Sequence, residues 1–223
     1  MRLRLRQSRS RTGPGQHRVV QPRRPLRHTS LRAPEPIGLL LGDHDGLNRL
    51  AGLFSFAAYS RHTIVHIPLR DGVPPAEGVG EPVDLVLVHH TLGLRPGKWP
   101  ELRRALAGGT PLTVRTDEAR TARDAASWRE RSQRADCRDE LRHATHARTF
   151  FLFGSRDVFA EAATRFARAA GRGPRQKGVA KGHSALMAGL PALVQQPGGG
   201  HPVEVLICFK PYPPYAHFRK PGR

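Results

Sequence analysis

Two adjacent histidines end the most apolar segment of the chain. Val83–Val88 is apolar except for Asp84, and His89-His90-Thr91 follows it directly. An imidazole with a pKa near neutrality can donate or accept a proton at physiological pH. Because successive side chains of a strand point to opposite faces, we expect only one of the two histidines to face a given pocket. His89 or His90 is therefore the candidate acid or base, with a solvent-exposed strand end as the alternative.

A second polar turn, Gly42-Asp43-His44-Asp45-Gly46, follows the apolar run Ile37–Leu41. Two carboxylates beside an imidazole can orient a water molecule or hold a metal. The alternative is a simple turn in which Asp45 caps the helix that follows. Asp43 and Asp45 are thus candidate catalytic residues, while the sequence assigns no metal site and implies no particular cofactor.

A Gly-Ser turn separates a predicted strand, Thr149–Phe153, from an amphipathic helix. The start of a helix presents free backbone N–H groups and a partial positive charge, which suit an anion. Gly154, Ser155 and Arg156 are therefore candidate phosphate-binding residues. The alternative is an ordinary strand-to-helix turn with Ser155 as the N-cap.

A basic, glycine-rich segment covers residues 171–182 and carries Lys177 and Lys181. Two of its glycines have the spacing of a P-loop, but Val179 stands where the P-loop lysine is required, so that motif is excluded. Lys177 and Lys181 remain candidates for phosphate contacts, and a solvated loop is the alternative.

A His-x-Thr pattern occurs twice, at His89-x-Thr91 and at His143-x-Thr145. This resembles the signature of the two-histidine phosphoesterases, in which histidines on two strands flank a phosphodiester. The resemblance covers six residues. It departs from the family because we expect His143 and Thr145 at the end of a helix.

Charge is the strongest compositional signal. Lysine and arginine number 37 against 18 acids, for a net charge of +19, and residues 1–34 hold ten arginines and no acid. Such a balance favours phosphate-rich partners. We expect residues 1–36 to form a disordered basic arm. The alternatives are arginine enrichment from a GC-rich genome and an over-extended start.

The order of predicted elements indicates the fold class. Short apolar strands alternate with helices, which predicts an α/β domain with a mainly parallel sheet and flanking helices, a Rossmann-like three-layer arrangement. We place this single domain at 37–209 and a Pro-rich basic tail at 210–223. Ligands of parallel sheets bind beyond the carboxyl ends of the strands. The loops at 42–46, 89–91, 154–156 and 210–212 should then share one edge.

Helices are predicted over 46–59, from Pro100, across the charged segment 117–147 and from Val158 to Ala170. No apolar run approaches the roughly 20 residues that span a bilayer. The two cysteines form no CxxC motif, and a reducing compartment is the default. We therefore expect a cytoplasmic protein, or an organelle-matrix protein if the Arg-rich start is a transit peptide.

These patterns together predict a function class. We expect a protein that binds a phosphate-bearing ligand, either a nucleotide or a nucleic acid, and whose catalytic form would be a histidine-dependent hydrolase or transferase. One alternative is a non-catalytic nucleic-acid-binding protein or a subunit of an RNA–protein assembly. A further alternative is a spurious or mis-framed reading with no evolved function.

Overall fold

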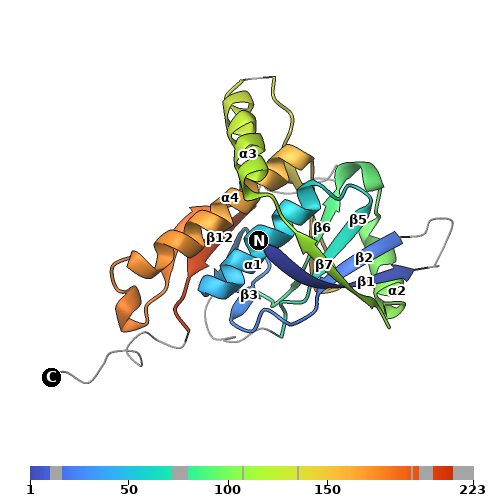
Figure 1. Cartoon of the computed structure of the whole chain (residues 1–223), viewed down its shortest axis with the longest axis horizontal. Coiled ribbons are helices and arrows are strands. Elements are labelled where there is room, and N and C mark those ends of the chain that lie inside the picture. Colours follow the sequence, from blue (N-terminus) through green and yellow to red (C-terminus); the bar gives the residue numbers. More distant parts are fainter. Residues whose placement is uncertain are drawn as a thin grey trace.

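The computed structural model describes every residue except 11–16, 72–79, 107, 135, 192, 196–202 and 213–223. Most of the predicted loop 71–82 and most of the tail 210–223 therefore lie outside the described residues. Within the described part, the chain forms an eight-stranded and a four-stranded sheet with flanking helices (Figure 1). The predicted α/β class is confirmed.

The larger sheet draws its strands from both halves of the chain. Their spatial order is β11-β8-β9-β6-β5-β2-β1-β7. The bounds of these strands are Arg2–Ser10 (β1), His17–Pro22 (β2), Thr63–Ile67 (β5), Asp84–His89 (β6), Thr110–Arg115 (β7), Leu141–His146 (β8), Thr149–Gly154 (β9) and Leu193–Gln195 (β11).

This sheet is mixed. The pairs β11–β8, β9–β6 and β5–β2 are parallel, whereas β8–β9, β6–β5, β2–β1 and β1–β7 are antiparallel. The prediction of a mainly parallel sheet is wrong, and the Rossmann-like arrangement is not confirmed. The reason is that three pairs of consecutive strands, β1–β2, β5–β6 and β8–β9, have no described helix between them, and β7 adds antiparallel to β1.

The smaller sheet has the order β10-β12-β4-β3. Its central pair, β4 and β12, is parallel. The strand bounds are Thr29–Leu31 (β3), Ile37–Gly42 (β4), Ala185–Gly189 (β10) and Glu204–Phe209 (β12). The predicted strands at Ile37–Leu41 and 203–209 therefore belong to this second sheet, not to the main one.

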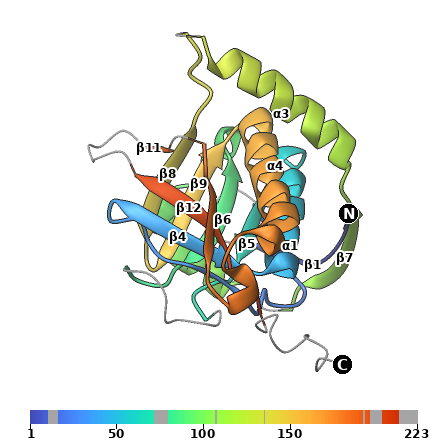
Figure 2. The same cartoon turned by 90° about the vertical axis from the view of Figure 1, so that its left-hand side faces the viewer.

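Two long helices lie side by side against the main core (Figure 1): α1 (His44–Ala58) and α4 (Arg156–Arg172). Both match the periodic apolar patterns in the sequence, and their apolar side chains join those of both sheets in one buried cluster. Helix α3 (Glu118–Ser132) packs along α4 (Figure 2). The short helix α2 (Trp99–Arg104) belongs to a second buried cluster, which includes Val86 and Phe151 of the sheet. None of the helices in the described residues is long and apolar enough to cross a bilayer.

The basic N-terminal segment is not a disordered arm. Strand β1, Arg2–Ser10, lies within it and pairs with β2 and β7. Leu3 and Leu5 are buried, while Arg2, Arg4 and Arg6 between them are exposed. This alternation is that of a half-buried strand, and the burial of the leucines provides the free energy to order it.

The charged segment 117–147 is neither one helix nor the expected helix pair. Helix α3 ends at Ser132, and β8 begins at Leu141 and pairs with β9 in an antiparallel hairpin. The two turn residues, Ala147 and Arg148, both have positive φ, as a tight hairpin turn of this handedness requires. Neither is an asparagine or glycine, so the turn has no sequence signal.

A buried ion-pair network fixes the start of β6. Asp84, 1% exposed, accepts hydrogen bonds from the backbone N–H groups of Leu69 and Arg70 at 3.1 and 3.2 Å and from the Arg70 guanidinium. His66 lies 3.4 Å away. Burial acts to raise the pKa of Asp84, but hydrogen bonds from His66 and Arg70 outweigh it, and the pKa lies well below its usual range.

Candidate functional site

Two of the predicted loops meet at one edge of the main sheet. Strands β6 and β9 are parallel neighbours, and His89 pairs in register with Gly154 at their carboxyl ends. The loop after His89 and the turn at Ser155 therefore lie next to each other. This part of the predicted arrangement is confirmed.

A polar depression of about 730 Å³ opens at this edge. It brings together His89, Ser155 and Arg156, which sequence analysis had selected, with groups from β2, β5, α1 and α3. Four arginines and two aspartates are among its lining residues. The full lining is Arg18, Ala58, Tyr59, Ser60, Arg61, His62, Thr63, His89, Arg120, Asp139, Ser155, Arg156 and Asp157.

The turn into α4 is held by its own side chains. The Ser155 hydroxyl accepts hydrogen bonds from the backbone N–H groups of Asp157 and Val158 at 3.2 and 3.3 Å, and donates one to Asp139 at 2.8 Å. A Cβ on Gly154 would come within 2.8 Å of the Val158 side chain. Gly154 and Ser155 thus serve the packing and capping of the turn, as the alternative interpretation stated.

The charge of Arg156 is largely balanced within the protein. Its Nε donates to Asp157 at 2.6 Å and lies 3.6 Å from Asp124. Burial acts to raise the pKa of Asp157, but hydrogen bonds from Arg156 and Arg131 outweigh this effect and lower the pKa. Arg156 is therefore less available to a phosphate than the arginines of the depression that form no ion pair among the described residues.

His89 is half-buried, and hydrogen bonds with Thr91 orient its ring. Its Nδ1 lies 2.8 Å from the Thr91 hydroxyl and accepts a 3.4 Å hydrogen bond from the Thr91 backbone N–H. Since Nδ1 accepts, the proton of the neutral ring is on Nε2. Burial lowers the pKa of His89, with further electrostatic contributions from the nearby His90 and Arg61.

His90 does not occupy the opposite sheet face. Strand β6 ends at His89, the chain turns into a 3₁₀ segment, His90–Leu92, and the rings of His89 and His90 lie 4.5 Å apart. Strand alternation therefore stops one residue too early for the expected separation. His89 lines the depression, whereas His90 is exposed and does not.

Asp43 and Asp45 lie elsewhere. Asp43 is the N-cap of α1 and accepts a 2.7 Å hydrogen bond from the Gly46 backbone, so the cap is Asp43 and not Asp45. Burial raises the pKa of Asp43. Helix α1 is about 22 Å long, and only its other end, at Ala58 and Tyr59, lines the depression. The two aspartates are thus not part of this site.

Lys177 and Lys181 are also separated from it. They follow the carboxyl end of α4, whereas Ser155 caps its amino end, and a helix of 17 residues spans about 25 Å. The His44 ring lies 3.1 Å from the Ala170 carbonyl oxygen, so the start of α1 adjoins the end of α4. The predicted phosphate-binding and catalytic residues therefore divide between two ends of the helix pair.

His143 lies in strand β8 and not at the end of a helix. It is 5% exposed, stacks on Phe150, and neither ring nitrogen has a hydrogen-bond partner within the described residues. It does not line the depression. The two His-x-Thr histidines are thus both on strands, but they do not flank one pocket.

Several residues that line the depression were not predicted from the sequence. Arg61 and His62 precede β5, which runs antiparallel to β6, so the beginning of β5 lies at the edge where β6 ends. Arg120 stacks over the Tyr59 ring, with its guanidinium carbon 4.3 Å from the ring centroid. The Arg61-His62 pair before an apolar strand was visible in the sequence, but an assumed parallel sheet places it at the wrong edge.

The arrangement combines arginines without carboxylate partners, a neutral imidazole and a fixed hydroxyl. Within the described residues, no group of three His, Cys, Asp or Glu side chains is placed to hold a metal. Comparisons with protein families, curated proteins and solved structures found no match. The chemistry of the depression therefore rests on its own geometry.

Proposed function

We propose that the chain binds a small phosphate-bearing ligand in the depression at the β6–β9 edge, and that His89 acts there as a hydrogen-bond donor when neutral and as a general acid when protonated. The observation that supports this most is the convergence of His89 with Arg61 and Arg120 around one polar hollow. A volume of about 730 Å³ is that of a small-molecule site. We place this function in the cytoplasm.

The roles follow from charge and protonation. Arg61 and Arg120 are exposed and form no ion pair within the described residues. The Arg61 Nε donates to His62 Nε2 at 2.9 Å, which leaves its other N–H groups and those of Arg120 available to a phosphate. A proton on Nε2 lets neutral His89 donate a hydrogen bond to a phosphate oxygen. Transfer of this proton to a leaving group requires the protonated ring, which returns to the neutral form as the leaving group is protonated. A hydrolase or transferase reaction at this phosphate is the catalytic form of the proposal.

The non-catalytic alternative is nucleic-acid binding, supported by the net charge of +19. It predicts that affinity for an oligonucleotide falls steeply with salt, because counterions are released from the phosphates. It also predicts that the loss on mutation depends on the number of arginines removed rather than on their position.

The test is titration with adenosine monophosphate of the wild type, of R61Q/R120Q and of a charge-matched control, R123Q/R134Q. Arg123 and Arg134 are exposed and do not line the depression. Loss of charge-assisted hydrogen bonds should weaken binding about tenfold or more in R61Q/R120Q and less than about twofold in the control. Equal losses in the two variants would contradict the proposal.

The histidine role is tested with phenyl phosphate as substrate, because its phenolate leaving group is basic enough to need protonation. We expect H89A to lose turnover by about 100-fold, the usual contribution of a general acid, and H90A to lose far less. H89Q, which retains a donor but cannot transfer a proton, separates binding from catalysis. Turnover in H89A at the wild-type rate would remove the catalytic form and leave only binding.

A further inference from the structure

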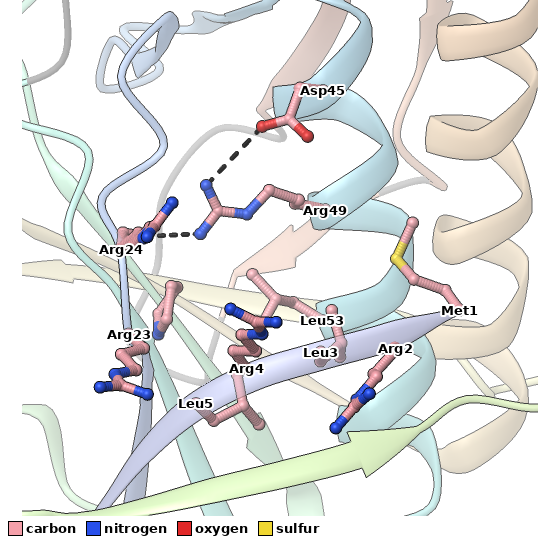
Figure 3. Close-up of a pocket in the computed structure, with 11 residues that line it drawn as sticks. Met1, Arg2, Leu3, Arg4, Leu5, Arg23, Arg24, Asp45, Arg49 and Leu53 are labelled. Atoms are coloured by element: carbon pink, nitrogen blue, oxygen red, sulfur yellow. Dashed lines mark hydrogen bonds and ion pairs between the residues drawn. The ribbon is translucent and has the colours of Figure 1, made fainter.

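A second hollow, of about 630 Å³, lies between β1, the start of α1 and the segment after β2. Figure 3 shows the side chains of Arg4, Arg23, Arg24 and Arg49 around this space. We call it the arginine hollow. Its lining residues are Met1, Arg2, Leu3, Arg4, Leu5, Pro22, Arg23, Arg24, Asp45, Arg49 and Leu53.

Its positive charge is mostly unbalanced. Five arginines line it against one carboxylate, Asp45, which lies 3.8 Å from Arg49. Arg4, Arg23 and Arg24 form no ion pair with any residue that the structure describes, and all three are exposed. Like charges gathered in a concave surface repel one another and attract a multivalent anion.

The backbone around the hollow is held in place without a ligand. The Arg23 N–H donates to the Arg4 carbonyl oxygen at 2.9 Å. The Arg49 guanidinium donates to the carbonyl oxygens of Pro25, at 3.0 Å, and of Arg24. Leu3, Leu5 and Leu53 are buried beneath. The backbone that carries the arginines is therefore already ordered, and binding has to order only their exposed side chains.

We propose that the arginine hollow is a binding site for a small ligand with two or more linked phosphate groups. Guanidinium groups bind phosphate oxygens through paired N–H donors, and several arginines around one concavity favour a ligand that carries several such groups. The volume, about 630 Å³, is that of a small-molecule site, which favours a compact polyphosphate over a nucleic-acid strand.

This site is independent of the proposed function. Asp45 and Arg49 belong to the first half of α1, and the β6–β9 depression touches only the other end of that helix, at Ala58 and Tyr59. The two hollows have no lining residue in common. One can thus be disabled while the other is measured.

The experiment is calorimetric titration with inorganic tripolyphosphate at about 0.15 M ionic strength, where exposed charges are well screened. The proteins are the wild type, R4Q/R24Q, the charge-matched control R123Q/R134Q, and R61Q/R120Q, which alters only the depression. Loss of two guanidinium forks should weaken binding about tenfold or more in R4Q/R24Q, but less than about twofold in the other two variants.

Three results would overturn the proposal. The first is no binding of tripolyphosphate by the wild type, and the second is an equal loss in R4Q/R24Q and R123Q/R134Q. The third is a single-stranded oligonucleotide that displaces tripolyphosphate and shows the greater loss in R4Q/R24Q, which would assign the hollow to nucleic acid. Binding by R61Q/R120Q at wild-type strength supports the site even if adenosine monophosphate fails to bind the depression.

Discussion

The two hollows differ in how their arginines are balanced. In the β6–β9 depression, Arg156 is paired with Asp157, whose pKa is lowered as a result, and Ser155 is hydrogen-bonded to Asp139. In the arginine hollow, Asp45 is the single carboxylate and it lies near Arg49. In the depression, part of the positive charge is therefore paired with carboxylates of the protein, whereas in the arginine hollow most of it has no carboxylate partner among the described residues.

This difference separates structural charges from charges available to a ligand. A buried and paired charge stabilises the fold only while its partner is present, because removal leaves an uncompensated charge. An exposed and unpaired arginine contributes little to stability. Stability and binding measurements should thus respond to different sets of residues.

We expect the largest loss of stability from a substitution of Asp84, the most buried carboxylate among the ion pairs of the described residues. Asp84→Asn removes the charge that Arg70 and Arg103 face, at 2.9 and 3.7 Å. We expect a loss of about 3 kcal/mol in the free energy of unfolding, measured by urea denaturation. The control is Asp136→Asn, because Asp136 is exposed. A loss below about 0.5 kcal/mol, as for surface substitutions, would contradict the distinction between structural charges and charges available to a ligand.

A smaller effect, of opposite sign, is expected at His143. Burial without a partner makes this ring a cost to the fold, so His143→Leu should raise the free energy of unfolding by about 1 kcal/mol at pH 7. Burial lowers the pKa of His143 below its ordinary value of 6.5. As the pH falls, the unfolded chain therefore takes up a proton on this ring before the folded chain does. Wild-type stability should therefore fall from pH 7.5 to 5.5.

His66 and His89, whose pKa values are also lowered by burial, add to this fall. The leucine variant lacks one of the three contributions and should show a shallower pH dependence. Chemical denaturation of both proteins at the two pH values measures this. Identical pH profiles, or a less stable variant at pH 7, would show that His143 has a partner or a role that the geometry does not reveal.

The smallest effect is expected in the arginine hollow. R4Q/R24Q should change the free energy of unfolding by no more than about 0.5 kcal/mol, because both side chains are exposed and unpaired. Any gain from reduced repulsion should shrink as salt is added. Thermal denaturation at low and high salt measures it. A large loss of stability would mean that these arginines hold β1 in place, and that they are structural charges rather than charges available to a ligand.

Local patterns in the sequence determined much of the fold. The apolar run of β6 and the helical periodicity of α1 and α4 predicted these elements, since each pattern buries one continuous apolar surface. The turn at Gly154 and Ser155 was located for the same reason. The alternation of arginine and leucine in β1 was equally readable, but the basic composition led to an expectation of disorder.

Strand direction was decided only by the tertiary structure. No residue within β5 indicates that it runs antiparallel to β6, although the loop predicted between them contains no crossover helix. This direction is what brings Arg61 and His62 to the edge where His89 ends β6. The β8–β9 hairpin turns on Ala147 and Arg148, which carry no turn signal, so His143 was assigned to a helix.

The assignment of strands to sheets was also a tertiary outcome. β4 and β12 form their own parallel pair in the second sheet, which places Asp43 with the far end of α4 and not with His89. Pairing between distant strands depends on how all the apolar faces are buried together, and no short stretch of sequence contains that information. The sequence determined which residues can carry chemistry, and the packing of the two sheets against α1 and α4 determined which of them meet.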